Sequence, residues 1–348
     1  MSITYNPDND IPDLSGKVIV ITGGKPTNQH SHSVLTTMLI IKSTGTAGVG
    51  KEAIKQLIKH NPAHIYFTGR NVQAANSLID EIKATTNNGN CITFVACDQT
   101  SLHSVRDAAQ VLLVKSGNLI DVLICNAGVM AVQPALSKDG YEIQFAINHL
   151  AHAMLVKLCL PALQNARAKS GGGSGHGRIV ITSSLAFKEA PKKTGIDFER
   201  LKEAQGGVSG PAMLAKYTLY SQSKLANVLH GSELARRYPE LTVASVHPGV
   251  IMTTELMDHM NCVDRFVVKM AVRNFLHVGL QEGSYNTLWG ATTTQIAKTG
   301  EDDAGFLKSG GIYHPVGTPI PHTPLSGDEA LAKQLWEWTE KELEGYLK

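Results

Sequence analysis

Tyr220 and Lys224, four positions apart, are the residues of this sequence best suited by type and spacing to acid–base chemistry. Residues at i and i+4 lie on the same face of a helix, so the phenol and the ammonium group become neighbours. A free phenol has a pKa of about 10, which is too high for efficient proton exchange near neutrality. A fixed positive charge beside the phenol favours the phenolate and lowers that pKa. The pair therefore predicts a proton-exchanging tyrosine assisted by a lysine.

The position of this pair in the chain matters more than its spacing, because the same spacing recurs by chance in many helices. Ser183 and Ser184 end a β-branched run upstream, and Asn148 interrupts an otherwise apolar helical stretch. Each has a purely structural alternative: Ser184 could cap a strand end, and Asn148 could bond the backbone at a helix kink. Their joint occurrence with Tyr220 and Lys224 favours one site that uses all of them.

The elements that must position these side chains alternate between short β-branched runs and amphipathic stretches, as in a parallel sheet covered on both faces. The predicted strands are mostly apolar throughout, which indicates burial on both faces; they are Lys17–Thr22, His64–Thr68, Cys91–Cys97, Ile120–Cys125, Arg178–Thr182, Leu241–Val246 and Gly311–His314. The predicted helices are Gly50–His60, Val72–Thr85, Leu102–Val114, Tyr141–Gln164, Tyr220–Arg237 and a closing helix at 328–348. The sequence thus predicts an α/β fold, a single Rossmann-like, doubly wound domain over residues 1–348 with a seven-stranded parallel sheet.

A glycine-rich turn at the end of the first strand is interrupted. The strand ends in Ile21-Thr22-Gly23-Gly24, and a helix is predicted to begin at Thr46-Ala47-Gly48-Val49-Gly50. Joined directly, the two pieces would form a turn whose backbone can approach a pyrophosphate at the helix N-terminus. They are separated by the 21 residues Lys25–Gly45, which begin polar and end in a short apolar run.

Three interpretations of Lys25–Gly45 remain open. Its two histidines, His30 and His32, could bind a metal, but without carboxylate or cysteine support they make a weak site, and no metal is predicted. The segment could be a lid loop, since long loops over active sites are often functional. The interpretation that we favour is a retained intron.

The retained-intron hypothesis rests on the codons that these residues permit. Gly24-Lys25 can be encoded GGT-AAG, which contains the donor GTAAG, and Thr44-Gly45 can end in the acceptor ACAG. Met38-Leu39-Ile40 can be encoded ATG-CTA-ATC, which holds a branch-like CTAAT. Removal of 21 codons keeps the frame and restores the turn. Genomic codons that lack the GT and AG ends would refute the hypothesis.

The restored turn, Thr-Gly-Gly-Thr-Ala-Gly-Val-Gly, resembles the TGxxxGxG turn of the short-chain dehydrogenase/reductase family. Further motifs follow in the family's order: Asn126-Ala127-Gly128 resembles NNAG, with Cys125 in place of the first asparagine, Tyr220-Ser-Gln-Ser-Lys224 resembles YxxxK, and Pro248-Gly249-Val250-Ile251-Met252-Thr253 resembles PGxxxT. The resemblance runs from about Leu14 to His314, leaving out the insertion. Asn148-His-Leu-Ala-His and Gly195-Ile-Asp-Phe look like the retinol-dehydrogenase-like branch, which includes fungal members.

The resemblance implies an oxidoreductase that interconverts an alcohol and a carbonyl compound, in which a nicotinamide cofactor carries the hydride and the protein orients it. Tyr220 would exchange the proton with the substrate oxygen, Ser184 would hydrogen-bond that oxygen, and Lys224 would also hold the nicotinamide ribose. Asn148 would bind the water that relays protons to Lys224. The expected cofactor contacts are Thr22, Gly23, Gly24, Thr46, Gly48, Val49, Gly50, Arg70, Asp98 at the adenine edge, Asn126, Ala127, Gly128, Tyr220, Lys224, Pro248, Gly249, Val250 and Thr253.

The choice between NAD and NADP rests on Arg70. An acidic residue after the second strand would accept hydrogen bonds from a ribose 2′-hydroxyl and favour NAD. The sequence there, Thr68-Gly69-Arg70-Asn71, offers an arginine instead, which suits the 2′-phosphate of NADP. The alternative is a solvated surface arginine. NADP is therefore the predicted cofactor, and it favours the reducing direction.

Composition restricts the partners and the compartment. The 32 basic side chains nearly balance the 30 acidic ones, so nothing favours nucleic acid or an anionic membrane. No apolar run approaches the roughly 20 residues that cross a bilayer, and the polar N-terminus does not resemble a signal peptide. Five scattered cysteines without a C-x-x-C pair favour reduced thiols and a cytoplasmic location. A homo-oligomer is expected from the family resemblance only.

The stretch 252–280, rich in Met, Val and Phe, is predicted to be a lid that favours a lipophilic alcohol or carbonyl substrate. Its alternative role is packing on the sheet or on a partner subunit. Fungal relatives often serve secondary metabolism, which suggests a polyketide or terpenoid carbonyl. One rival function is a catalytically impaired member of the family, whose interrupted glycine-rich turn binds cofactor poorly. A second, a sugar-nucleotide epimerase or dehydratase, disagrees with the glycine spacing and lacks a substantial C-terminal substrate domain.

Overall fold

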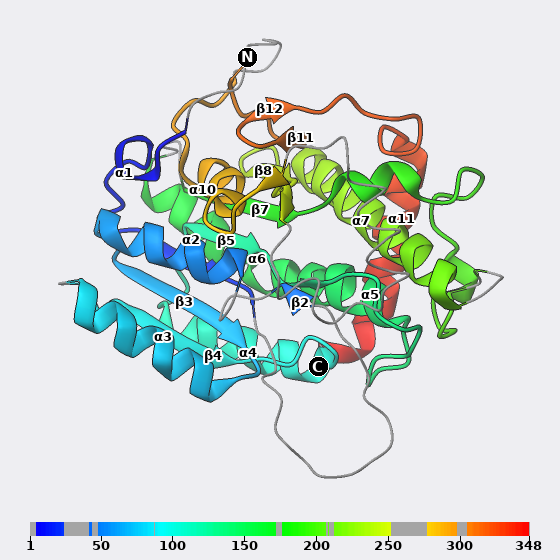
Figure 1. The fold of residues 1–348 in the computed structure, drawn as a ribbon, viewed down its shortest axis with the longest axis horizontal. Helices are drawn as coiled ribbons and strands as arrows, with labels where there is room; N and C mark the ends of the chain where they lie inside the picture. The colour runs from blue at the N-terminus through cyan, green and yellow to red at the C-terminus, as the bar shows by residue number, and fades with distance from the viewer. Residues whose placement is uncertain are drawn as a thin grey trace.

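An eight-stranded sheet organises the chain in the computed structural model, which describes residues 5–23, 42–43, 48–86, 88–171, 176–206, 208, 212–251, 277–297 and 305–347 (Figure 1). The strands are β1 (Val18–Ile21), β3 (His64–Gly69), β4 (Ile92–Ala96), β5 (Val122–Cys125), β7 (Arg178–Thr182), β8 (Thr242–Val246), β11 (Gly311–His314) and β12 (Thr318–Pro319). Their order across the sheet is β12-β11-β8-β7-β5-β1-β3-β4.

The seven predicted strands are the ones that pair in parallel within this sheet, so the α/β, doubly wound fold is confirmed. The eighth, β12, was missed. It runs antiparallel to β11 at the edge of the sheet, and two residues, one of them proline, carry no strand signal in a sequence.

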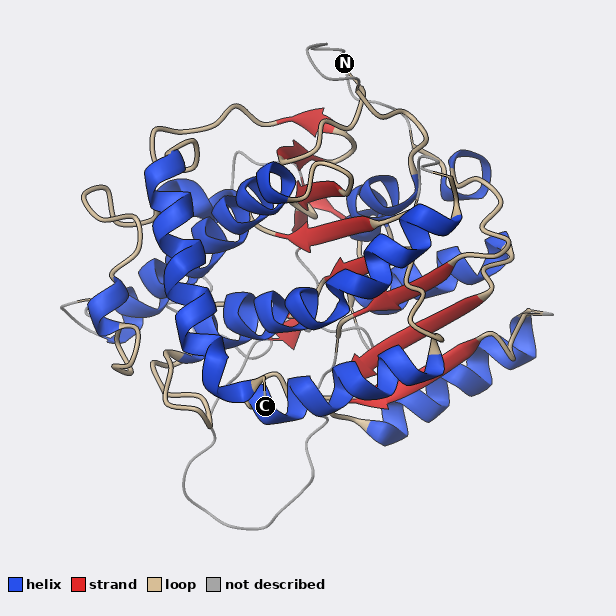
Figure 2. Cartoon of the chain, turned by 180° about the vertical axis from the view of Figure 1, so that it is seen from behind, coloured by secondary structure: helices blue, strands red, loops and turns tan. Residues whose placement is uncertain are grey.

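Alternating side chains of each strand enter two separate cores, one on each face of the sheet. Ile19 and Ile21 of β1 pack with α2 (Val49–Leu57), α3 (Val72–Thr85) and α10 (Tyr285–Thr292). Val20 packs with α4 (Leu102–Lys115), α6 (Ala151–Lys169) and α7 (Ala212–Arg237), and α11 (Glu329–Leu343) lies against α7. Figure 2 shows these helices on both sides of the strands. Burial of one such aliphatic side chain stabilises the fold by roughly 1.5–3 kcal/mol.

Two of the predicted helices differ from the observed ones in ways that bear on the site. The predicted helix Tyr141–Gln164 is broken into α5 (Ile143–Phe145), a π-helical turn (Ala146–Leu150) and α6. The prediction that Tyr220 opens its helix was wrong, because α7 begins eight residues earlier at Ala212. The segment Ala-Met-Leu-Ala before Tyr220 consists of strong helix formers, so the helix extends through it.

The ends of the other helices follow local signals. The helix predicted as Gly50–His60 is α2 followed by a 3₁₀ turn (Ile58–His60). Asn71 caps α3 by accepting a hydrogen bond from the backbone of Ala74 at 2.9 Å, and α3 has the predicted bounds. Asp328 caps α11 in the same manner, and a 3₁₀ turn (Glu344–Tyr346) ends the predicted C-terminal helix.

Shorter elements complete the chain: α1 (Pro7–Asp10), 3₁₀ turns at Leu185–Glu189, Phe198–Arg200 and Glu282–Ser284, and two small two-stranded sheets. One small sheet pairs β9 (Val250–Ile251) with β10 (His277–Val278), so residues 252–276 of the predicted lid lie outside the described residues. The other pairs β2 (Lys42–Ser43) with β6 (Gly128–Val129).

One helical region, Ile143–Lys169, has the length and hydropathy of a membrane span. Its most apolar window is 78% buried inside the fold, as is usual for a core helix. The apolar face is therefore already covered by protein.

Candidate functional site

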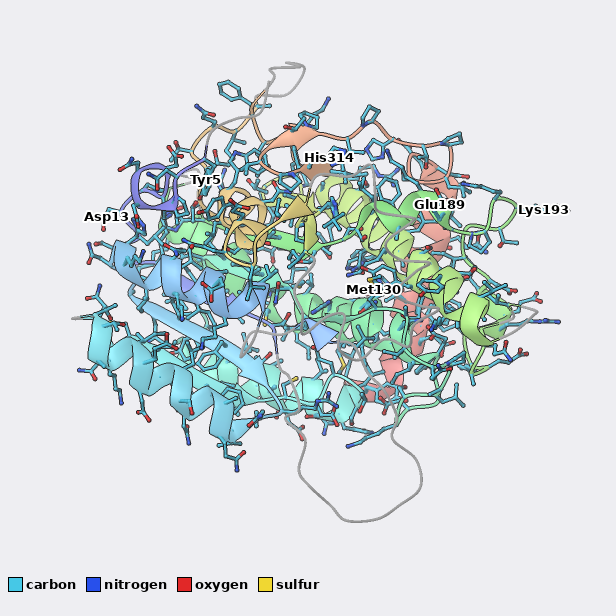
Figure 3. All side chains as sticks on the ribbon, viewed as in Figure 1. Tyr5, Asp13, Met130, Glu189, Lys193 and His314 are labelled. Carbon is cyan, nitrogen blue, oxygen red and sulfur yellow. The ribbon has the colours of Figure 1, made fainter. Side chains whose placement is uncertain are left out.

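The predicted catalytic side chains gather beyond the carboxyl ends of the parallel strands. Met130 and His314, labelled in Figure 3, mark this edge, because Met130 follows β6 and His314 ends β11. α7 carries Tyr220 and Lys224 in its interior, two turns or more after its start. The Lys224 ammonium lies 5.7 Å from the centre of the Tyr220 ring and donates a hydrogen bond to the carbonyl of Thr182 at 2.9 Å. The i, i+4 spacing in the helix therefore places the phenol and the ammonium group side by side, as predicted.

Burial shifts both titrations, and in opposite directions. It raises the pKa of Tyr220 to about 12, while the hydrogen bond with Ser184 acts to lower it. Burial also lowers the pKa of Lys224 to about 7. The expected lowering of the tyrosine pKa by a fixed ammonium is thus not found in this state of the protein. A desolvated lysine holds its charge poorly, so its field on the phenol is weakened.

Ser184 follows β7 and caps the short 3₁₀ turn after it. Its hydroxyl accepts a hydrogen bond from the backbone of Ala186 at 3.3 Å, as the structural alternative in the sequence suggested. The same hydroxyl is a hydrogen-bond partner of Tyr220. Capping and contact with the phenol therefore coexist in Ser184.

Asn148 lies in the π-helical turn and is fully buried. Its side chain accepts from the Val129 amide at 2.8 Å and donates to the Val129 carbonyl at 2.9 Å. It also donates to the Ser223 hydroxyl at 2.9 Å, and Ser223 donates in turn to the Tyr220 carbonyl at 2.7 Å. Asn148 is thereby tied both to the strand end and to the helix of Tyr220.

Gly128, a predicted cofactor residue, lies against two of the predicted catalytic side chains. A Cβ atom added to it would stand 3.1 Å from Asn148 Oδ1 and 3.5 Å from Lys224 Nζ. These two polar atoms are therefore neighbours across one backbone position. A side chain there would contact both of them.

The strand end at Thr22 is held by the segment after β5. The Thr22 hydroxyl accepts hydrogen bonds from the backbone amides of Asn126 at 3.0 Å and Ala127 at 3.1 Å. The Asn126 side chain donates to the Thr22 carbonyl at 3.1 Å. The structure therefore brings together two predicted cofactor motifs that lie about a hundred residues apart in the chain.

Five of the predicted cofactor residues line one small cavity of about 20 Å³: Gly23, Arg70, Asp98, Ala127 and Gly128. Arg70 lies 3.6 Å from Asp98, and Lys138, which was not predicted, lies 2.9 Å from it. Burial of Asp98 acts to raise its pKa, but hydrogen bonds from Lys138 and Thr100 outweigh burial, so the pKa is lowered. Two cations thus flank the carboxylate at this end. A volume of this size holds about one water molecule.

Other predicted cofactor residues are only partly placed. Gly48 precedes α2 with a φ of +66°, a conformation that favours glycine, and Val49 and Gly50 are buried in the first turn. Gly249 follows Pro248 with a φ of +89°, next to Val250 of β9. Gly24, Thr46 and Thr253 lie outside the described residues, as do His30 and His32.

The described part of the insertion lies against the site. Lys42 and Ser43 of β2 pair antiparallel with Val129 and Gly128 of β6. The Val129 amide donates to Asn148, and Gly128 lies beside Asn148 Oδ1 and Lys224 Nζ. Lys42 and Ser43 of the inserted segment therefore lie directly beside the predicted catalytic residues.

Sequence analysis missed four contributors: Lys138, Thr182, Ser223 and His152. Thr182 acts through its carbonyl, which leaves no signal in a sequence. Ser223 directly precedes Lys224, and its place between the motif residues was a usable signal. His152 is the last residue of the motif Asn148-His-Leu-Ala-His, and its contacts are described below.

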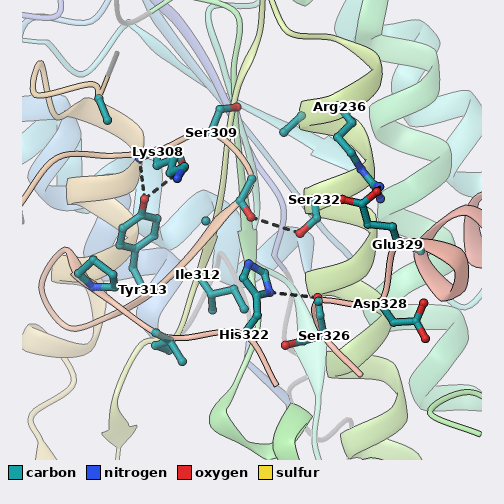
Figure 4. Close-up of a pocket in the computed structure, with 18 of the residues that line it drawn as sticks. Ser232, Arg236, Lys308, Ser309, Ile312, Tyr313, His322, Ser326, Asp328 and Glu329 are labelled. Atoms are coloured by element: carbon teal, nitrogen blue, oxygen red, sulfur yellow. Dashed lines mark hydrogen bonds and ion pairs between the residues drawn. The ribbon is translucent and has the colours of Figure 1, made fainter. Parts of the chain in front are cut away.

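A large cavity of about 790 Å³ lies elsewhere, between the end of α7, β11 and the start of α11 (Figure 4). His322 donates to the Ser326 carbonyl at its rim, and Arg236 pairs with Glu329 at 3.0 Å. Arg236 is 16 residues beyond Tyr220, roughly 24 Å along the helix axis. This cavity is therefore separate from the predicted site. Within the described ranges, no group of three metal-ligating side chains is found.

Comparison with known proteins connects the chain to one family. The family model described as short chain dehydrogenase matches residues 39–195. A short-chain dehydrogenase/reductase of Armillaria gallica is 32% identical over 344 residues, covering 97% of this chain and 94% of the relative. The chloroplastic short-chain dehydrogenase TIC 32 A of Brassica napus is 32% identical over 305 residues, covering 86% of this chain and 87% of the relative.

Solved structures agree on the fold. A putative uncharacterized protein from Mycobacterium paratuberculosis superposes with a TM-score of 0.64 at 23% identity, covering 97% of both chains. NADPH-bound carbonyl reductase from chicken fatty liver superposes with a TM-score of 0.57 at 16% identity, covering 91% of this chain and 98% of that one. The family model's match begins inside the insertion and leaves out β1, so the interruption breaks the family's pattern at this point.

Proposed function

Because the chain belongs to the short-chain dehydrogenase/reductase family and is an oxidoreductase of that type, we propose that it is an NADP(H)-dependent enzyme that interconverts an alcohol and a ketone or aldehyde on a lipophilic small molecule. The observation that carries the proposal is the convergence of Ser184, Tyr220, Lys224 and Asn148 at one strand edge. A protein that does not move protons at a substrate oxygen would not need these four side chains in one place.

The residues present fit a dinucleotide in two respects. Gly128 has no side chain, so the space beside Asn148 Oδ1 and Lys224 Nζ stays open to a ligand. Among the described residues, Asn126 Oδ1 is buried without a hydrogen-bond partner, and it belongs to the motif that would face the cofactor. When bound, the reduced cofactor supplies the hydride for the carbonyl carbon.

The chain's own residues handle the oxygen and the proton. Ser184 donates to the substrate oxygen and holds it beside Tyr220. Tyr220 then gives its phenolic proton to that oxygen as the carbonyl is reduced, and takes a proton back in the oxidising direction. Lys224 stabilises the phenolate that forms, and Asn148, clasped by Val129, holds the water through which protons reach Lys224. Burial raises the pKa of Tyr220 to about 12, so we expect the rate of proton transfer to depend on this assistance.

The cofactor preference is proposed from Arg70, with Lys138 as a second cation close by. We expect Arg70→Ala to weaken NADPH binding about tenfold, since one charge-assisted contact to the 2′-phosphate is lost. NADH binding should change little. Fluorescence titration of both cofactors measures this, with the exposed Lys333→Ala on α11 as the matched control for lost charge. Equal weakening for NADPH and NADH would refute a role in recognising the phosphate.

A lipophilic substrate is proposed from the apolar side chains beside Asn148. Val129, Val132 and Ile147 form a small buried cluster with Ile143 there. A panel of aliphatic aldehydes of increasing chain length tests this, and kcat/KM should rise with length. A preference for short polar carbonyl compounds would contradict the proposal. The fungal relatives, drtF of Aspergillus calidoustus and calI of Penicillium decumbens among them, support a role in secondary metabolism. The retinol-dehydrogenase-like branch and the cytoplasmic location stay predictions from the sequence.

The second candidate is a catalytically impaired member of the family. Two observations favour it: Lys42 and Ser43 lie beside Gly128 and Val129, and the cavity that the cofactor residues line is only about 20 Å³. NADPH titration of the full chain separates the candidates. Saturable binding supports the enzyme with a harmless insertion, whereas no binding by folded protein supports the impaired form and the retained-intron hypothesis for 25–45.

A further inference from the structure

A buried histidine connects the two motifs of the proposed site. His152 Nε2 lies 2.8 Å from the Thr22 hydroxyl, and His152 Nδ1 lies 3.0 Å from the backbone carbonyl of Asn148. Gln99, which lines the small cavity, donates its amide to His152 Nε2 at 3.0 Å. Thr22, Asn148 and His152 are each at most 3% exposed. One imidazole therefore touches the strand end of the nucleotide site and the backbone of the π-helical turn.

The surrounding groups allow a single tautomer of the neutral ring. A carbonyl oxygen only accepts, so His152 Nδ1 must carry the proton that it shares with Asn148. Nε2 must then accept, and its single lone pair is shared by the Gln99 amide at 3.0 Å and the Thr22 hydroxyl at 2.8 Å. Burial lowers the pKa of His152 to about 4, and the charge of Lys224 acts in the same direction, so the ring is neutral near pH 7.

The Thr22 hydroxyl completes the arrangement. Its oxygen already accepts from the amides of Asn126 and Ala127, which leaves one proton to donate. That proton goes to His152 Nε2 at 2.8 Å rather than to the Ile124 carbonyl at 3.4 Å. The hydrogen bonds thus run in one direction, from the Asn126–Ala127 turn through Thr22 and His152 to Asn148.

We propose that His152, as the Nδ1–H tautomer, is a positioning residue that holds the cofactor-facing turn and the Asn148 backbone in register with each other. The inference rests on the proposed function for its kinetic consequences but not for its tautomer. A buried and fully satisfied chain of this kind specifies one arrangement of its members. Its loss lets the turn and the helix move independently of each other.

Two variants of similar size each keep one of the two contacts of His152 and lose the other. Asn at 152 keeps a donor near the Nδ1 position and loses the acceptor for Thr22, whereas Gln keeps an acceptor near the Nε2 position and loses the donor to Asn148. We expect His152→Asn to weaken NADPH binding about tenfold and His152→Gln to lower kcat about tenfold with little change in cofactor affinity. His64→Asn is the matched control. His64 also contacts a threonine hydroxyl, that of Thr93 at 2.8 Å, but it lies at the amino-terminal end of β3, away from the site.

This split would not follow from a merely structural role. If both His152 variants lose affinity and kcat together, in proportion to their loss of stability and as His64→Asn does, the proposal is overturned. The same holds if neither variant changes either quantity.

The tautomer is tested without cofactor or substrate. Nitrogen-15 NMR of histidine-labelled full chain, with His152→Gln to assign the signal, should show a protonated Nδ1 and a bare Nε2. Thr22→Val should move the Nε2 resonance and leave Nδ1 in place. An Nε2–H or doubly protonated ring at pH 7 would overturn the proposal. Should NADPH fail to bind while the Nδ1–H tautomer is found, the proposed function fails and the positioning network stands.

Discussion

The two halves of the site at the strand edge are built in different ways. In the catalytic half, Tyr220 and Lys224 share one long helix, and Asn148 is clasped by Val129 and Ser223. In the nucleotide half, β1 ends at Ile21 and α2 starts at Val49, with the insertion between them. The catalytic half relies on periodicity and buried hydrogen bonds, whereas the nucleotide half relies on a short loop of fixed length.

This difference shows which kind of site tolerates an insertion. Extra residues in a loop cost little closure entropy, so the sheet and both cores form regardless. A phosphate-binding turn, however, needs its glycines and the helix N-terminus at a set separation. We therefore expect the insertion to leave the catalytic geometry intact and to act, if it acts at all, on cofactor affinity, and each prediction below tests one side of that contrast.

The largest effect concerns the phenol. Tyr220→Phe should lower kcat about 1,000-fold, because the acid that protonates the substrate oxygen is removed. Cofactor affinity should stay within a factor of about two, since the ring itself remains. Steady-state kinetics and fluorescence titration measure the two quantities. Tyr217→Phe, three residues earlier in α7, is the control; an equal loss there would show that the helix, and not the phenol, is responsible.

Deletion of residues 25–45 should repair the nucleotide half. We expect the Kd for NADPH to fall about 100-fold, because the backbone amides at the start of α2 regain a charged phosphate partner. A chain in which the same 21 positions carry a glycine–serine linker keeps the interruption and serves as the control. Equal affinity of the full and the shortened chain would end the contrast between the halves.

The buried Lys224 should lower the free energy of unfolding of the protein near neutral pH. Its pKa is about 7 in the folded protein and near 10.5 when unfolded, so the unfolded chain binds more protons between these values. The free energy of unfolding should therefore rise with pH from about 7 to about 10.5, by at most about 1.4 kcal/mol per pH unit.

The variant Lys224→Met should lack this rise and be more stable than the wild type at pH 7. Urea denaturation at several pH values measures it, with exposed Lys333→Met as the control. If Lys224→Met follows the wild-type pH dependence, the lysine keeps its charge in the folded protein.

The smallest effect concerns Gly128, the predicted cofactor residue that lies against Asn148 and Lys224. In Gly128→Ala, the new methyl group would lie 3.1 Å from Asn148 Oδ1, so the amide must yield by a few tenths of an ångström. A shift of that size should lower kcat about three- to tenfold without unfolding the protein. Kinetics together with thermal denaturation measure it. An unchanged kcat would mean that catalysis does not depend on the exact position of the Asn148 amide.

The sequence predicted the seven parallel strands and the bounds of α3 well, because buried β-branched runs and an Asn71 cap are local signals. It did not predict the π-helical turn, since the helix register at Asn148 depends on Val129 and His152 in three dimensions. The Thr22–His152 contact joins residues 130 positions apart, which no local pattern reveals. The apparent pKa of Tyr220 was expected to fall, and burial, which a sequence does not show, reversed it.

The eighth strand limits how this protein can associate with copies of itself. β12 covers the open side of β11, and its Pro319 has no amide proton to offer to a further strand. Sheet edges are templates for pairing between chains, and a short strand that ends in proline is a poor template. We therefore expect that two copies do not extend the sheet through β12, and that an assembly on this side of the molecule would use side chains of the helices and loops around it.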